Sequence, residues 1–164
     1  MTAAAKDPRA IDAVTSARSD HQAGSSPAGT ATDDVVILLA RASGAALRCA
    51  NAALEPFGMR ARHYATLTIA AGAGGVPQRQ IGALLGLDPS AVVAIVDDLE
   101  SSSLVQRLPD PDDRRTRLVS ITPAGRQMLD TVAGVAKAVQ DQALAGLDAT
   151  ERGVFVSHLR RIVS

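Results

Sequence analysis

The sequence predicts a mainly α-helical protein with one small β-hairpin. Apolar residues recur at helical spacing up to about residue 101 and again after residue 122. Between these stretches, residues 104–108 and 116–121 alternate in character, as half-buried strands do. The segment that joins them, Pro109-Asp110-Pro111-Asp112-Asp113, is typical turn material. A chain of 164 residues suits one domain, or one domain plus a tail.

Composition excludes several classes of protein. A formal net charge of zero argues against indiscriminate coating of nucleic acid, but allows a sequence-specific reader whose positive charge is gathered on one surface. The single cysteine excludes an intramolecular disulfide and a Cys-rich zinc site, and the three histidines are far apart, so no metal or cofactor is expected. No apolar run approaches the ~20 residues of a membrane span. With no signal peptide at the N-terminus, we expect a soluble, cytoplasmic protein without a membrane partner.

The N-terminal third divides into a tail and a first helix. Residues 1–32 are rich in small and polar residues and broken by prolines, which predicts a flexible tail; a short docked helix is the alternative. The Thr32-Asp33-Asp34 sequence caps a helix at about 33–54 that is apolar around most of its circumference. Such a helix needs cover on more than one side, which in a small chain indicates a second subunit. A second helix at 59–71 and a third that opens at Pro77 are expected next.

The central stretch, residues 78–122, predicts two short helices with a tight turn between them, followed by the hairpin. Its small and apolar residues occupy the offsets that a helix-turn-helix needs: Gly82, Gly86, Val92 and Ile95. Asp88 and Pro89 are suited to the N-cap and first position of the second helix. An ordinary helical hairpin would share these features, so the adjoining β-hairpin is what favours a DNA reader.

Two further helices are expected after the hairpin. Thr122 and Pro123 begin a helix that runs to about Ala145, about 33 Å at ~1.5 Å per residue, which is longer than one small core requires. Asp148 and Glu151 have capping-box spacing and launch a last helix. One face of that helix carries Val154, Phe155, Leu159 and Ile162.

The segment LGLDPSAVVAIVDDLESSSLVQRLPDPDDRRTRLVSITPAG resembles the signature of the MarR family of bacterial transcription regulators, which share a winged helix-turn-helix. The resemblance implies a reader module at 59–121 within a domain at 33–164. It further implies that helices at 33–55 and 122–164 interlock two chains into a homodimer. A coiled-coil-like partner for another protein is the alternative use of these terminal helices.

Carried over from the family, the DNA-binding residues lie on the helix pair and on the wing. Arg115 is the first candidate for a minor-groove contact, and Asp113 would restrain the wing arginines by ion pairing. A hairpin that is merely solvated by its charges is the alternative. Ser90 is suited to a phosphate or base-edge hydrogen bond, and Arg60, Arg62 and Arg79 to phosphate contacts. The complete predicted set is Arg79, Ser90, Ala91, Val93, Ala94, Arg107, Arg114, Arg115 and Arg117.

Three residues depart from the family pattern. Where the family commonly has a hydroxyl residue at position 93 and arginines at 94 and 98, this chain has Val93, Ala94 and Asp98. The predicted groove-facing surface therefore lacks an arginine and carries two carboxylates, Asp97 and Asp98, of which Asp98 is the anomaly. Either Asp98 accepts a hydrogen bond from a cytosine or a nearby arginine, or it lowers DNA affinity. The second interpretation is favoured, which predicts weak binding that depends on the wing, on thymine contacts and on DNA shape.

A small-molecule effector is the last expectation, with Arg48, His63 and Tyr64 as pocket residues; Tyr64 could equally fill the core. Cys49 is interpreted as a buried, unreactive thiol. No nucleophile elbow or phosphate-binding loop is present, so an enzyme is not expected. We therefore predict a DNA-binding regulator, usually a repressor, that binds a pseudo-palindromic operator as a homodimer and is released by a small apolar or phenolic effector. A dimeric adaptor that binds protein is the alternative.

Overall fold

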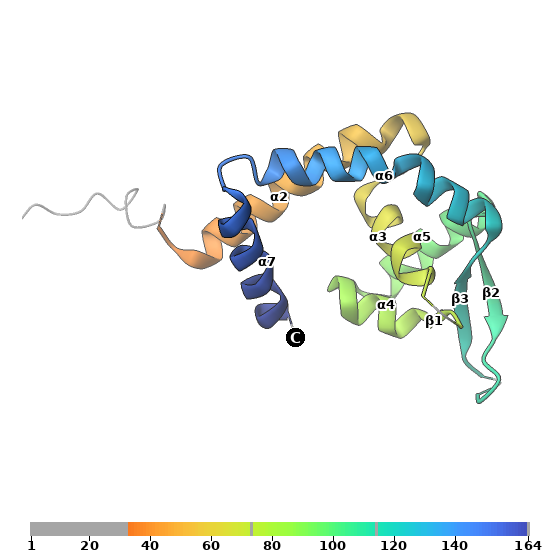
Figure 1. Ribbon diagram of the computed structural model, residues 1–164. Helices are drawn as coiled ribbons and strands as arrows, with labels where there is room; N and C mark the ends of the chain where they lie inside the picture. The colour runs from red at the N-terminus through yellow and green to blue at the C-terminus, as the bar shows by residue number, and fades with distance from the viewer. Residues whose placement is uncertain (1–32, 73, 114, 164) are drawn as a thin grey trace, which may run out of the picture. The chain divides into compact units, whose positions relative to one another are not determined.

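The computed structural model describes residues 33–72, 74–113 and 115–163; the predictions for the 1–32 tail and for Arg114 lie outside these ranges. Residues 42–164 form one compact unit. Its chain begins within α2 (Val35–Leu54) and continues through the short 3-10 helix η2 (Glu55–Phe57) to α3 (Ala61–Ala70) (Figure 1). Then follow β1 (Val76–Pro77), α4 (Gln78–Leu85), α5 (Pro89–Ser101), β2 (Val105–Pro109), β3 (Arg117–Ile121), α6 (Pro123–Ala143) and α7 (Ala149–Val163).

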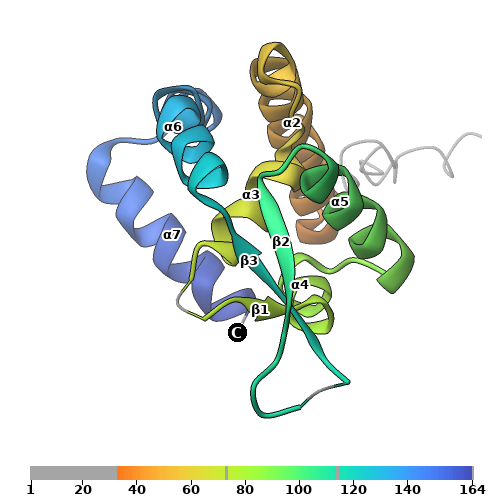
Figure 2. The ribbon, with the colours of Figure 1, turned by 90° about the vertical axis from the view of Figure 1, so that its right-hand side faces the viewer.

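The three strands form one antiparallel sheet in the order β1-β3-β2 (Figure 2). The predicted hairpin is confirmed, with Arg107 opposite Val119 and Val105 opposite Ile121. The sequence did not indicate the strand β1, whereas Pro77 does stand at the start of the third helix, as predicted. Pro77 pairs with Leu118 and precedes α4 as its N-cap. Two residues are too few to show an alternating pattern, so only the long-range pairing with β3 reveals this strand.

The helix-turn-helix has the local chemistry that the sequence predicts. Gly86 ends α4 with a left-handed φ of 61°, a conformation that glycine adopts at little cost. A Cβ on Gly82 would lie 3.2 Å from the carbonyl oxygen of Leu87 and 3.3 Å from Val92 Cγ2, so a small residue lets the two helices pack closely. The apolar face of α5 joins the core through Val92, Ile95, Val96 and Leu99.

The start of α6 is fixed against the sheet. The Thr122 hydroxyl donates to the carbonyl oxygen of Ser103 (2.7 Å) and accepts the backbone N–H of Gly125 (3.0 Å). At Gly125 the backbones approach so closely that a Cβ would stand 2.1 Å from the Leu104 carbonyl oxygen. Farther along α6, Val132 is fully buried. The predicted capping box of α7 is present, since Asp148 and Glu151 each accept the backbone N–H of the other.

The helices at the two ends of the described chain leave much apolar surface uncovered. Val36 on α2 is 74% exposed and Val163 on α7 is 81% exposed, and α7 buries no residue. The segment Val35–Phe57 is long and apolar enough to cross a membrane by length and composition alone, which corrects the expectation that no segment has this character. The core helix of a soluble protein passes the same test.

Candidate nucleic-acid interface and adjoining cavity

The outward face of α5 has the composition that the sequence predicts. Ser90, Val93, Ala94, Asp97 and Asp98 are exposed, whereas Ala91 is half-buried. Apolar Val93 and Ala94 therefore stand at the middle of this face, with acidic residues toward its C-terminal end. No arginine of α5 itself is available to grip a guanine, because the helix contains none.

The N-terminus of α5 is capped by Asp88, whose carboxylate accepts the backbone N–H of Ala91 (3.0 Å). The Ser90 hydroxyl donates to the same carboxylate. These two hydrogen bonds lower the pKa of Asp88, with the serine contributing most. The predicted contact residue Ser90 thus has an intramolecular role in this structure, and its hydroxyl would have to turn away from Asp88 to donate to DNA.

Arg107 ties the wing to the helix-turn-helix. Its guanidinium is ion-paired with Asp97 (2.6 Å) and with Glu100 on α5, and its Nε donates to Gln78 Oε1 on α4 (2.9 Å). Burial alone lowers the pKa of Arg107, but the hydrogen bonds that it donates to the two carboxylates, together with their negative charges, outweigh burial and the net pKa is raised. Arg107 was predicted as a DNA contact; in this structure its guanidinium joins β2 to α4 and α5.

A second network orders the wing tip. Asp113 accepts the backbone N–H of Arg115 (3.0 Å) and the hydroxyl of Thr116 (2.8 Å), and these bonds lower its pKa, that of Thr116 most. Thr116 in turn accepts a hydrogen bond from Arg79 on α4 (3.4 Å). Asp113 was expected to restrain the wing arginines by ion pairing, but among the described residues it restrains the backbone of the loop instead.

Arg115 and Arg117 are exposed cations of the wing. Both lie at or just after the wing tip, and neither has an ion-pair partner within the described part of the chain. Their charges are therefore available to an external anion. Arg79, the remaining described arginine of the predicted set, is also exposed; it donates a hydrogen bond to Thr116, and its charge helps to lower the pKa of Asp113.

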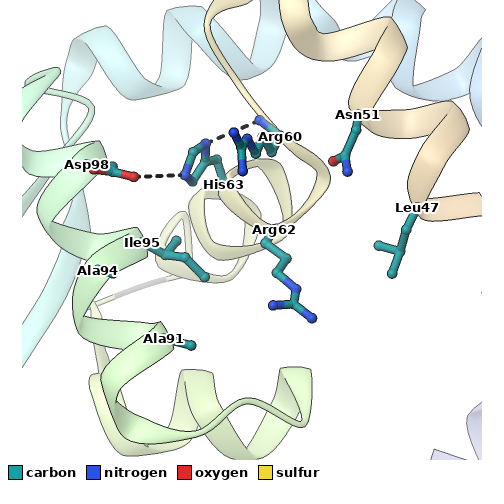
Figure 3. Close-up of a pocket in the computed structure, with 9 residues that line it drawn as sticks. All are labelled: Leu47, Asn51, Arg60, Arg62, His63, Ala91, Ala94, Ile95 and Asp98. Atoms are coloured by element: carbon teal, nitrogen blue, oxygen red, sulfur yellow. Dashed lines mark hydrogen bonds and ion pairs between the residues drawn. The ribbon is translucent and has the colours of Figure 1, made fainter. Parts of the chain in front are cut away.

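Asp98 has a partner that the sequence did not indicate. His63 Nε2 lies 3.4 Å from Asp98 Oδ2, so α5 and α3 are joined by this pair (Figure 3). The other ring nitrogen of His63, Nδ1, accepts the backbone N–H of Arg60 at 3.2 Å. His63 therefore caps the start of α3 with one nitrogen and faces the carboxylate of α5 with the other.

The His63–Asp98 pair borders a cavity of about 420 Å³ between α2, α3 and α5. Figure 3 shows residues of all three helices around it, with the Arg62 side chain between α3 and α2. Asn51 on α2 accepts the backbone N–H of Ala61 at 2.8 Å and so fixes α2 to the start of α3. The lining is Leu47, Asn51, Arg60, Arg62, His63, Ala91, Ala94, Ile95 and Asp98.

The structure does not gather the predicted effector residues into one site. His63 borders the cavity above, whereas Tyr64 borders a separate, mostly apolar hollow of about 250 Å³ between α2, α3 and α6. Arg48 is exposed and lines neither. Consecutive helical residues point about 100° apart, which is why His63 and Tyr64 diverge. The cations of the first cavity are Arg60 and Arg62, which sequence reasoning had considered only as phosphate contacts.

Two other features weighed in the sequence are Cys49 and a metal site. Cys49 is half-buried on α2, and its thiol lies 3.3 Å from Gln142 Oε1 on α6. Within the described residues, no three His, Cys, Asp or Glu side chains are grouped as metal ligands.

A helix-turn-helix whose second helix is exposed on one face, followed by an antiparallel wing, defines a winged helix-turn-helix protein. The MarR family model matches residues 60–116. A MarR-family transcriptional regulator from Rhodococcus sp. RHA1 is 38% identical with a TM-score of 0.76; the match covers 80% of this chain and 94% of that one. The chain belongs to the MarR family and is a transcription regulator rather than an enzyme.

Two more relatives are informative. CouR from Rhodococcus jostii RHA1, whose structure was determined bound to p-coumaroyl-CoA, is 38% identical with a TM-score of 0.72, and the match covers 80% of this chain and 93% of CouR. The transcriptional repressor NicR of Pseudomonas putida is 32% identical over 77 residues, which are 47% of this chain. The match spans only 49% of the length of NicR.

Proposed function

We propose that this protein is a cytoplasmic repressor that binds a pseudo-palindromic operator as a homodimer. The observation that carries the proposal is the combination of an exposed α5 face with two exposed wing arginines that have no ion-pair partner within the described residues. An α-helix fits the major groove, and an arginine beside it can enter the adjoining minor groove. The family membership supports the same use of this surface.

The contacts that would confer sequence preference are unusual. Val93 and Ala94 can pack against thymine methyl groups, and Arg115 and Arg117 can respond to minor-groove width. Asp97 is engaged by Arg107, so this carboxylate is partly neutralised on the DNA side. We therefore expect preference for A·T-rich half-sites, with strong dependence on the wing.

The exposed apolar surfaces of α2 and α7 support dimer formation. Isolated apolar side chains are normal on a protein surface, but these recur along both helices at the two ends of the described chain. A second copy of the chain would remove them from water and would set two α5 helices at the fixed spacing that a palindrome requires.

The cavity beside His63 supports a small-molecule effector. Its Arg60, Arg62 and His63 side chains favour a negatively charged group, while Leu47, Ile95 and the alanines favour an apolar body. The CoA thioester bound by CouR combines an aromatic acyl group with phosphates. We therefore propose an aromatic acid or its CoA thioester as the effector, in place of a purely apolar compound.

Selection from a random duplex pool at stated salt, followed by gel shift, tests the function. The proposal predicts enrichment of an inverted repeat, two chains per duplex, and release by p-coumaroyl-CoA or a related thioester. Failure to enrich any motif, with a dimer still formed, would instead favour the protein-binding adaptor. Enrichment without release by any aromatic acid or thioester would remove the effector assignment and leave DNA binding in place.

A further inference from the structure

The three carboxylates near the C-terminal end of α5 are held on two sides. Asp97 and Glu100 face the wing and share Arg107, whereas Asp98 faces α3 and pairs with His63. Asp98 also lines the cavity, together with Ala91, Ala94 and Ile95 of the same helix. The helix that carries the proposed DNA contacts therefore forms one wall of the cavity in which an effector would bind.

The hydrogen bond that the His63 ring accepts fixes where its proton lies. Because the backbone N–H of Arg60 donates to Nδ1, this nitrogen carries the lone pair and the ring proton belongs on Nε2. Asp98 Oδ2 lies 3.4 Å from this Nε2. A single imidazole N–H can satisfy one strong acceptor, so a second anion near Nε2 competes with Asp98 directly.

The pair is built so that a competitor can break it. Asp98 is 70% exposed and its contact is long, whereas His63 is only 15% exposed and stays in place at the start of α3. A solvent-exposed pair contributes little binding energy. An anion within the cavity would interact with Arg60 and Arg62 as well as with His63, so it gains interactions that Asp98 lacks.

We propose that Asp98 is a positioning residue that acts through His63: it holds α5 against α3 while the cavity is empty, and a carboxylate or phosphate group entering the cavity displaces it. The inference rests on the proposed function for its biological meaning and deepens it. Displacement would remove one weak restraint on α5 and free the Asp98 carboxylate to turn toward the DNA-binding face, where it repels phosphates. Both effects lower affinity for an operator. Asp98, a residue at which this chain departs from the family pattern, would therefore take part in the response to the effector.

Benzoate and benzamide are the probes, because they differ in charge but share one ring. The ¹⁵N resonances of the His63 imidazole are followed during each titration of the full chain. Benzoate is expected to shift the Nε2 resonance at saturation, and benzamide to leave it unchanged. The Asp98→Asn variant should bind benzoate about two- to fivefold more tightly, the range that corresponds to losing one weak, exposed anion that competes for Nε2.

Two control variants separate displacement from a general loss of negative charge. Glutamine at position 63 still offers an oxygen to the Arg60 N–H, so His63→Gln should keep the helix cap. In that background Asp98→Asn is expected to leave benzoate affinity unchanged. Glu55→Gln removes an equal charge from an exposed residue just before α3, and it too should have no effect on wild-type affinity.

The proposal is wrong if Asp98→Asn tightens benzoate binding equally in the wild-type and His63→Gln backgrounds. It is also wrong if no benzoate concentration shifts the His63 Nε2 resonance. These titrations contain no DNA. If the protein bound no duplex, the proposed function would be wrong, but the outcome of the titrations would not change. With a selected operator, Asp98→Asn should also lower the ratio of operator to random-duplex affinity about two- to fivefold, but not in the His63→Gln background. An unchanged ratio would show that Asp98 does not position α5.

Discussion

At the scale of single residues, the effect of a charged side chain depends on which residue it pairs with. Asp97 and Asp98 are neighbours in sequence with the same ionised group, yet one meets an arginine of the wing and the other a histidine of α3. The sequence-based hypothesis treated both as charges facing DNA. The structure gives each an intramolecular partner, so the repulsion of phosphates by this face depends on whether those pairs remain closed.

Arg115→Ala is expected to weaken operator binding by about 1–3 kcal/mol, because the side chain is exposed at the wing. Arg115 has no ion-pair partner within the described residues, so the substitution breaks no ion pair there. Fluorescence anisotropy at several salt concentrations would measure it, and the salt slope should fall by about one ion. Arg126→Ala is the matched control, since Arg126 is exposed at the start of α6, at the opposite end of β3 from the wing tip. Equal losses in both variants would contradict a specific role for Arg115.

Thr66→Val is expected to stabilise the fold. The Thr66 side chain is fully buried, and its hydroxyl has no hydrogen-bond partner within the described structure. Replacing an unsatisfied buried hydroxyl by a methyl group should raise the free energy of unfolding by about 1–3 kcal/mol. Chemical denaturation would measure the change. Thr68→Val is the control, because the exposed Thr68 hydroxyl donates to the Tyr64 carbonyl and its loss should change stability little. A destabilised Thr66→Val would show that the hydroxyl has a partner in solution.

At the scale of elements, close backbone approach makes particular glycines indispensable. Gly125→Ala would push a methyl group against the Leu104 carbonyl and the Ile121 side chain, where no space exists. Overpacking of this kind costs about 1–3 kcal/mol or more, because β2 and α6 must separate. Thermal unfolding would report a lower Tm.

Gly134 provides the comparison within the same helix. A Cβ there would meet nothing within 4 Å, so Gly134→Ala should raise stability by up to about 1 kcal/mol through helix propensity alone. If both alanine variants changed Tm in the same direction, the packing argument for Gly125 would fail.

At the scale of the whole molecule, the exposed apolar helices need a partner surface. We expect a dimer at micromolar concentration by light scattering, and aggregation or loss of fold after deletion of residues 148–164, because α7 buries no residue and leaves apolar side chains exposed along its length. A stable folded monomer of the full chain would contradict this prediction. A clean monomer after the deletion would show that α7 alone makes the dimer contact.

The sequence by itself determined the elements whose signals are local. Helical periodicity, the Asp88 and Thr122 caps, the capping box at Asp148 and the left-handed turn at Gly86 all act within about four residues, so their patterns are visible along the chain. The inward face of α5 and the hairpin followed from the same local rules. The family resemblance then supplied the arrangement of these elements, which their periodicity alone does not specify.

Only the tertiary structure decided which distant side chains meet. The strand β1 exists through pairing with β3, which lies far along the chain, Arg107 meets Gln78 across 29 residues, and Asp98 meets His63 from a different helix. One helical step separates His63 from Tyr64 into different hollows. Such contacts depend on how helices cross and strands align, and no short-range pattern encodes those distances, so the link between cavity and DNA-binding helix became visible only in three dimensions.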